Sequence, residues 1–151
     1  MHVVDVAARV HAGYVAVPGS IPGPQGVATR RSLVAVTSWG VGMTGSHVVR
    51  LFEGAGSVWT PLRVIGAGFG APGCANGQLE RPLGLRFTAD GTGLTVADCR
   101  HGRVGLFATA DGSFVAQLAT GLVAPVDVEE CEGGWSRVAS RPPWNLWVAM
   151  V

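Results

Sequence analysis

The sequence contains no lysine and few charged residues of either sign. All 11 basic residues are arginine, 10 residues are acidic, and the formal net charge of the 151 residues is +1. A chain with so little excess charge carries no strong field that would attract nucleic acid or an anionic membrane. Composition alone therefore gives no electrostatic reason to expect either partner.

Cysteine is also scarce, and no segment is suited to a membrane or to export. The three cysteines, at positions 74, 99 and 131, form neither an even disulfide set nor a CxxC metal motif. The start MHVVDVAARV lacks a basic segment followed by an apolar run, and the long uncharged stretch 32–49 is broken by Gly, Ser and Thr. We expect reduced thiols and no membrane partner, which favours a cytoplasmic location.

The chain also lacks a helical hydrophobic period over any window of helix length. What it has is 23 Gly, 9 Pro and 48% apolar residues. The apolar content is too high for a disordered chain. Gly and Pro spread between short runs of Val, Leu and Thr predict many short strands joined by tight turns. The length fits a single all-β domain.

Three stretches repeat one pattern: a glycine, an apolar residue, a proline and a short strand. They begin at Gly19, Gly77 and Gly121, and their prolines are Pro24, Pro82 and Pro125. A second strand is predicted after each at 33–37, 94–98 and 136–140, a third at 47–52 and 103–107, and a fourth at 62–66 and 114–118. Four short strands in a unit of roughly 40–50 residues form a β-propeller blade.

The repeat divides the chain into a half blade at 1–18 (strands 2–6 and 14–17), blades at 19–76 and 77–120, and a half blade at 121–140. The remaining residues 141–151 include Pro142 and Pro143, which cannot continue a ladder, so we expect a tail outside the repeat. About three blade-equivalents cannot close a six-bladed ring. We expect a fragment of a longer protein or, as the second hypothesis, a homodimer that completes the ring.

Residues 77–107 carry the motif most fully and resemble the NHL-repeat family of β-propellers. The resemblance is less complete over 19–66 and partial over 121–140. The matching residues are Gly77, Gln78, Leu79, Pro82, Gly84, Asp90, Gly91, Val96, Ala97, Asp98, His101, Arg103, Val104 and Phe107. The resemblance implies four-stranded antiparallel blades of the six-bladed TolB-like type, here in an incomplete ring. The family includes propellers that bind proteins or RNA and enzymes similar to gluconolactonases and the peptide-amidating lyase.

Within this motif we expect Asp98 and Arg103 to form a structural pair. The carboxylate would accept hydrogen bonds across the turn, and the guanidinium would span it. The first repeat has Thr37 at the expected Asp position and Val48 at the expected Arg position. Because both partners are replaced together, a structural role is favoured over a functional one.

Other polar residues of the repeat are predicted to serve turns. Asp90 and Asp111 each precede a glycine, which is typical of hairpin turns. His101 lies in the turn that follows Asp98, and we interpret it as a turn residue rather than a ligand.

Two further patterns suggest chemistry without the context that the chemistry requires. The run VIGAGFGA at 64–71 has the form of a dinucleotide fingerprint, but Pro72 follows where a helix must begin, so no cofactor is predicted. In the run DVEECE, alternation places Asp127 and Glu129 on one strand face, which makes them weak candidates for a divalent cation. No GxSxG motif supports nucleophilic catalysis.

These patterns favour a binding scaffold over an enzyme, because loops on a rigid framework concentrate function. We predict that loops 38–47 and 66–77 contact a protein or peptide partner. The contact residues we predict are Trp39, Met43, Phe69 and Arg100. Two alternatives stay open: a metal-dependent propeller enzyme of the lactonase or lyase kind, and an RNA-binding propeller of a ubiquitin-ligase-type protein.

Overall fold

A computed structural model of the chain describes residues 2–5, 10–14, 21–40, 47–66, 73–131, 135–140 and 147–150. Within these ranges every regular element is a β-strand, and each strand pairs antiparallel to its neighbour. The predicted all-β class is confirmed, with four-stranded antiparallel sheets in an open, propeller-like arrangement. None of the described residues forms a helix long and apolar enough to cross a membrane.

The strands form four sheets that follow one another along the chain. The first contains β1 (His2–Asp5) and β2 (Val10–Tyr14). The second contains β3 (Pro24–Arg30), β4 (Leu33–Ser38), β5 (Val48–Ala55) and β6 (Val58–Ile65). The third contains β7 (Pro82–Phe87), β8 (Gly93–Asp98), β9 (Arg103–Ala108) and β10 (Phe114–Ala119). The last contains β11 (Pro125–Cys131), β12 (Trp135–Ser140) and β13 (Trp147–Met150).

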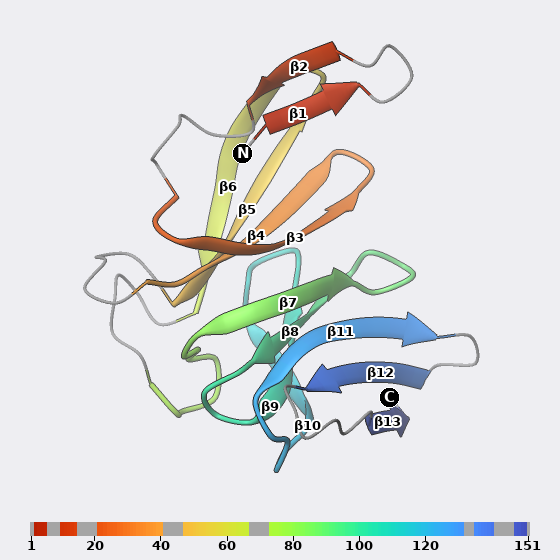
Figure 1. Cartoon of the computed structure of the whole chain (residues 1–151). Helices are drawn as coiled ribbons and strands as arrows, with labels where there is room; N and C mark the ends of the chain where they lie inside the picture. The colour runs from red at the N-terminus through yellow and green to blue at the C-terminus, as the bar shows by residue number, and fades with distance from the viewer. Residues whose placement is uncertain are drawn as a thin grey trace.

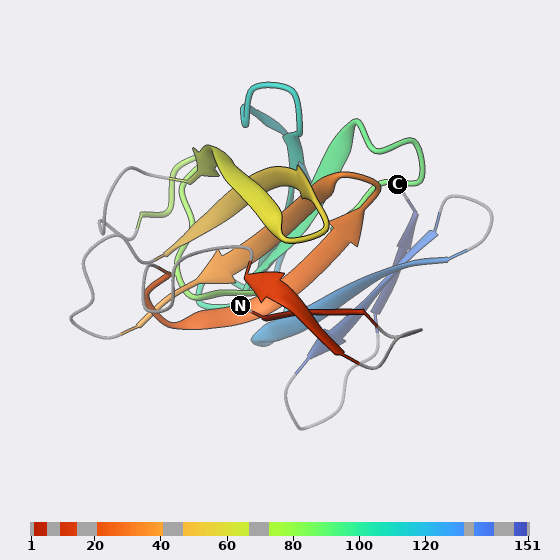
Figure 2. The same ribbon diagram turned by 90° about the horizontal axis from the view of Figure 1, so that it is seen from above.

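Figure 1 shows the sheets stacked in chain order, with the first strands of three sheets, β3, β7 and β11, on the side that faces the viewer. Figure 2 looks down this stack from the end that carries β1 and β2. In each four-stranded sheet the spatial order equals the chain order, so neighbouring strands are joined directly. This is the arrangement that the repeat predicted for a blade.

Two terminal segments differ from the sequence prediction. Residues 147–150 form β13, which pairs with β12 and takes the position of a third strand, although a tail outside the repeat was expected for 141–151. Pro142 and Pro143 precede β13 and so do not interrupt its ladder; their own structure lies outside the described residues. Near the other end, β2 begins at Val10 rather than at the apolar run 14–17, because its pairing with β1 sets the bounds.

The second strands, β4 and β8, are the most buried because each lies between two layers. All six residues of β8 are buried, as are five of the six in β4. In β4, Ala35 packs in the core shared with the third sheet, whereas Val34 and Val36 belong to a cluster on the opposite side. Burial on both faces explains why these strands appear as continuous apolar runs instead of alternating ones.

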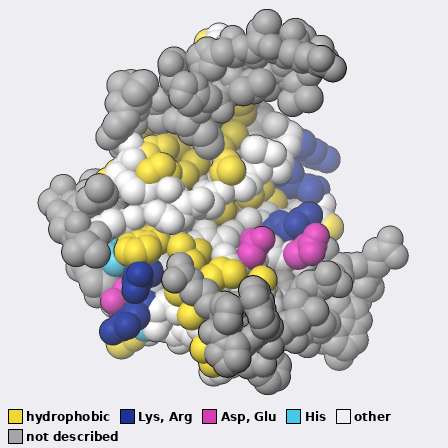
Figure 3. Space-filling model, viewed as in Figure 1, with side chains coloured by type: hydrophobic (Ala, Val, Ile, Leu, Met, Phe, Trp, Pro, Cys, Tyr) yellow, Lys and Arg dark blue, Asp and Glu magenta, His cyan; other side chains and the backbone are white. Residues whose placement is uncertain are grey.

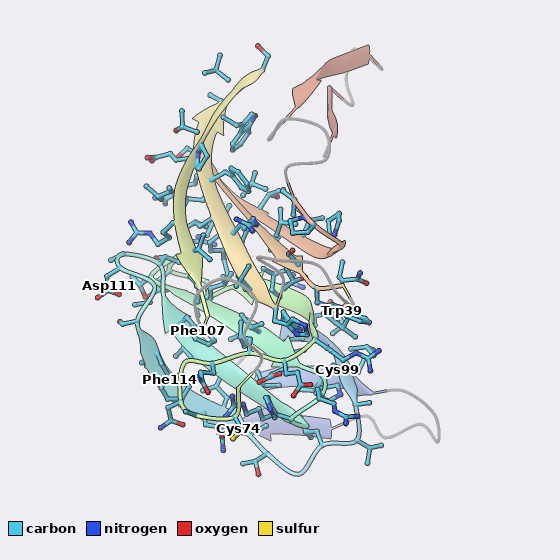
Figure 4. All side chains as sticks on the ribbon, turned by 90° about the vertical axis from the view of Figure 1, so that its left-hand side faces the viewer. Trp39, Cys74, Cys99, Phe107, Asp111 and Phe114 are labelled. Atoms are coloured by element: carbon cyan, nitrogen blue, oxygen red, sulfur yellow. The ribbon has the colours of Figure 1, made fainter. Side chains whose placement is uncertain are left out.

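The largest core cluster joins the second and third sheets. Its buried members from the second sheet are Ala35, Val49, Leu51 and Ile65, and those from the third sheet and the connection before it are Leu79, Leu85, Phe87, Leu94, Val96 and Phe107. Phe114 packs against the cluster, with its ring edge-on to Phe107 at a centroid distance of 5.7 Å (Figure 4). A smaller cluster joins the third and last sheets through Val104 and Val128.

Glycine permits the close approach of the first strands. A Cβ on Gly26 would lie 2.3 Å from the carbonyl oxygen of Leu83, and one on Gly84 would lie 2.4 Å from the Cα of Asp127. Real Cβ atoms do not come so close to backbone, so both positions require glycine for β3, β7 and β11 to pack as they do. The third repeat has Asp127 at the equivalent position, two residues after its proline, and this residue is exposed.

Candidate functional site

The connections between the second and third strands of each blade, and those between blades, lie on one side of the molecule. Because successive strands alternate in direction, the end of β4, the end of β8 and the start of β7 all reach this side. We call it the connection face, and its described residues are 38–40, 47–48, 73–82, 98–103 and 119–125. It is the left-hand side of Figure 1 and faces the viewer in Figure 4, where Trp39, Cys74 and Cys99 are labelled.

Asp98, at the end of β8, organises the centre of this face. Its side chain is buried, and Oδ1 accepts a hydrogen bond from the backbone N–H of Glu80 at 2.9 Å. Oδ2 accepts from Arg103 Nε and from His101 Nδ1, each at 2.9 Å. A buried carboxylate is stable only when it is paired and hydrogen-bonded, and these three donors meet that need. The expected contact between Asp98 and Arg103 is therefore present.

Arg103 extends this network into the connection that precedes β7. Its Nη1 donates to the carbonyl oxygen of Cys74 at 2.9 Å, and its Nη2 donates to those of Gln78 at 2.7 Å and Ala75 at 3.2 Å. One guanidinium thus fixes a turn of the blade and a connection about 25 residues earlier in the chain. Because the Asp98 carboxylate and the Arg103 guanidinium both bind other parts of the chain, their contacts accord with a structural role.

In the first blade the residue equivalent to Asp98 is Ser38, which corrects the alignment that placed Thr37 there. Ser38 lies opposite Pro24 as Asp98 lies opposite Pro82, and it faces Val48 as Asp98 faces Arg103. The Ser38 hydroxyl donates to the carbonyl of Pro22. Asp98 accepts from the residue at the same place in its own blade, two before the proline. The two side chains thus fasten equivalent connections.

Thr37 instead joins two blades. Its hydroxyl donates to the carbonyl oxygen of Leu83 in β7 at 2.5 Å and accepts from the backbone N–H of Gly26 at 2.7 Å. The sequence alone does not show which residue of the run LVAVTS pairs with Pro24. The alignment of Thr37 with Asp98 was therefore wrong by one residue.

A second group of contacts holds the loop between β4 and β5 against the connection that leads from β6 to β7. The guanidinium carbon of Arg81 lies 4.2 Å from the centroid of the Trp39 ring, a cation–π contact. The backbone N–H of Arg81 donates to His47 Nδ1 at 3.1 Å. The ring centroids of Trp39 and His47 are 6.5 Å apart. Arg81 and His47 have φ of 56° and 65°, in the left-handed region. These contacts fix their side chains on the connection face.

Burial lowers the pKa of His47 below its ordinary value, and Arg81 lowers it further, whereas Glu80 and Asp98 act in the opposite sense. The neutral form of His47 therefore predominates at pH 7, because its ordinary pKa is already 6.5 and its environment lowers it. A neutral imidazole has one nitrogen that can accept, and here the acceptor is the Nδ1 that faces the Arg81 amide.

Next to these groups lies a cavity of about 310 Å³ that opens on the connection face. Arg81, Arg100 and His101 line one part of it, and Leu122 and Ala124 line another. Among the described residues that line it there is no Asp or Glu. Glu80 stands close by, with its carboxylate 3.3 Å from His101 Nε2 and 3.9 Å from Arg100 Nε. The cavity thus combines cationic donors with apolar surface.

Two of the four predicted contact residues can be placed. Trp39 is half-buried on the connection face, and Arg100 is on the same face with 64% of its side chain exposed. Met43 and Phe69 lie outside the described residues. Sequence reasoning missed Arg81 and Glu80. Their only local signal is their position directly before Pro82, the first residue of β7.

Asp127 and Glu129 are both exposed on β11, with Val128 buried between them, as the expected alternation requires. Asp127 Oδ1 accepts from the backbone N–H of Val128 at 2.9 Å, and Glu129 lies 3.9 Å from Arg86 Nη1. Asp127 lines a cavity of about 400 Å³ between β3, β7 and β11. In the described part of the chain, no three His, Cys, Asp or Glu residues are grouped so that they could hold a metal ion.

No family model matches the sequence, and no curated protein matches it. Among solved structures, the chain is similar to the hydrazine synthase of Kuenenia stuttgartiensis, with a TM-score of 0.65 over 92% of this chain at 18% sequence identity. This chain spans 35% of the length of that chain. A second match is to the computationally designed Ika4 protein, with a TM-score of 0.44 at 12% sequence identity. The match covers 90% of this chain and 96% of the Ika4 chain. The first likeness shows the fold alone.

Proposed function

We propose that this chain is an NHL-type propeller segment that binds a protein or peptide partner through its connection face. The observation that carries the proposal is the convergence of Trp39, Arg81 and Arg100 on one face beside an open cavity. Figure 3 shows basic, histidine and hydrophobic side chains, with acidic atoms among them, gathered at the left-hand edge of the molecule, on this face. Tryptophan and arginine are the residues that most often dominate the energy of protein interfaces.

The framework beneath these side chains supports a binding role. Asp98 and Arg103 fasten the turn after β8 to the connection before β7. Arg81 and His47 fasten that connection to the first blade. A face that is held in place before binding loses little conformational entropy on binding, which favours affinity.

The two alternative functions find less support in the described residues. An enzyme that depends on a metal needs a cluster of ligands, and no such cluster occurs in this part of the chain. Binding of single-stranded RNA relies on aromatic rings that stack on bases. On the described part of the connection face the aromatic side chain is Trp39, and Arg81 covers one face of its ring.

The test is a peptide-display selection on the whole chain, followed by calorimetric titration of the enriched peptides. We expect the double variant Trp39→Ala/Arg100→Ala to bind at least about tenfold more weakly, since the loss of an interface hot spot costs roughly 2 kcal/mol or more. Met43→Ala/Phe69→Ala tests the other two predicted contacts. Arg31→Gln, an exposed arginine in the β3–β4 turn on the opposite side, is the matched control.

Two results would contradict the proposal. One is the absence of enrichment over a scrambled library. The other is enriched peptides that bind the Trp39→Ala/Arg100→Ala chain as tightly as they bind the original chain, with both chains folded by circular dichroism.

A further inference from the structure

We infer that the cavity lined by Arg81, Arg100 and His101 takes a carboxylate, and that the peptide partner therefore presents an Asp or Glu side chain there. This inference rests on the proposed peptide-binding function and deepens it by naming the chemistry of the ligand. The donors, the charge balance and the apolar lining of this one cavity support it.

The donors are present and incompletely used. Arg81 Nε is buried, and among the described residues it has no hydrogen-bond partner. Arg100 Nε lies 3.9 Å from Glu80, beyond hydrogen-bond distance, and most of its side chain is exposed. A carboxylate that enters the cavity can accept from the exposed Arg100 guanidinium and lies beside the positive charge of Arg81, which also lines the cavity. Hydrogen bonds between arginine and carboxylate are among the strongest in proteins.

The charges around the cavity favour an anion. Asp98 does not offer free negative charge, because Arg103 and His101 donate to its Oδ2. Glu80 faces Arg100, so the two carboxylates of Asp98 and Glu80 stand against the three arginines Arg81, Arg100 and Arg103. Arg81 stands without a carboxylate partner among the described residues, and its side chain is held over Trp39. The surplus charge is therefore positive and lies on the cavity wall.

The size and lining favour an amino-acid side chain over a nucleotide. A volume of about 310 Å³ is at the lower end of ligand cavities, roughly 300–1,000 Å³. Leu122 and Ala124 provide apolar surface for the methylene groups of Asp or Glu. A nucleic acid needs a run of phosphate contacts, whereas the whole chain has a net charge of only +1. An acidic peptide with a neighbouring apolar side chain suits this surface.

The experiment compares two display selections, one on the original chain and one on Arg100→Gln, with Arg31→Gln as the control. The exposed Arg100 can be changed without disturbing the packed Arg81, so this variant separates binding from folding. We expect Asp or Glu to be enriched at one peptide position on the original chain and on the control, and not on Arg100→Gln. The enriched peptide and its Glu→Gln or Asp→Asn twin are then titrated against the original and Arg100→Gln chains.

On the original chain the amide twin should bind about tenfold more weakly, and on Arg100→Gln the two peptides should differ by less than about twofold. Enriched peptides without an acidic position would overturn this inference and leave the peptide-binding function standing. No enrichment on any chain would overturn the function itself. A competition experiment gives one further outcome. If a 12-nucleotide RNA or inorganic phosphate displaces the bound acidic peptide at a lower concentration than the unlabelled peptide does, the inference is also overturned.

Discussion

The buried side chain of Asp98 is predicted to contribute strongly to the stability of the chain. Its removal would leave Arg103 half-buried without its counter-charge, and the backbone N–H of Glu80 without an acceptor. Breaking a buried ion pair by removing one partner costs about 3–5 kcal/mol. We therefore expect Asp98→Ala to lower the free energy of unfolding by roughly this amount in urea titrations. Glu53→Ala, at an exposed strand position, is the control and should change it by less than about 0.5 kcal/mol.

Asp90 gives a prediction about pH. The hydroxyl of Thr88, followed by the hydroxyl and the backbone N–H of Thr92, lowers the pKa of Asp90 from 3.8 to about 2. Because the folded pKa lies below the unfolded one, the ionised form stabilises the turn above pH 3.8, and this contribution is lost as pH falls toward 2. An NMR titration of the Asp90 carboxyl should show the low value. A midpoint near 3.8 would show that the hydrogen bonds of the turn are absent in solution.

At the scale of the element, close packing of the first strands depends on Gly84. A methyl group there would lie 2.4 Å from the Cα of Asp127, so β7 and β11 would have to separate. Overpacking of this kind costs typically 1–3 kcal/mol. We expect Gly84→Ala to destabilise the chain by about this amount and to speed hydrogen exchange in β11 more than in β4. Gly56→Ala, with nothing within 4 Å of the added atom, isolates the penalty of its positive φ.

Asp127 limits what can follow the last sheet. It stands where Gly26 and Gly84 stand in the preceding blades, and at those positions the next first strand comes within Cβ contact. A further blade, from this chain or from another, could pack against β11 as closely as β7 packs against β3 only if the Asp127 side chain turned aside. The exposed carboxylate thus distinguishes this sheet from the two before it.

At the scale of the whole molecule, stability should be highest in the middle of the stack. The largest core cluster joins the second and third sheets, and β4 and β8 lie between layers on both sides. In stacked repeats each unit is stabilised by its neighbours, so units with two neighbours open last. Native-state hydrogen exchange should therefore find the slowest amides in β4 and β8 and faster ones in β1 and β13. Uniform protection across all four sheets would contradict this order.

The sequence by itself determined the strands and turns of the two central blades, because these depend on neighbouring residues. Apolar runs such as LVAVT and LTVAD mark buried strands, and Asp90 and Asp111 mark turns in which each accepts local hydrogen bonds. The contact between Asp98 and Arg103 was also predictable, since the two residues flank one short turn.

Only the tertiary structure decided which distant segments meet. The register that places Ser38, and not Thr37, opposite Pro24 depends on pairing between strands. The contact of Arg81 with Trp39 and His47 joins residues from different blades, and β13 exists through its pairing with β12. Such contacts form between residues far apart in the chain, and local patterns of apolar and turn residues carry no information about which of them will lie side by side.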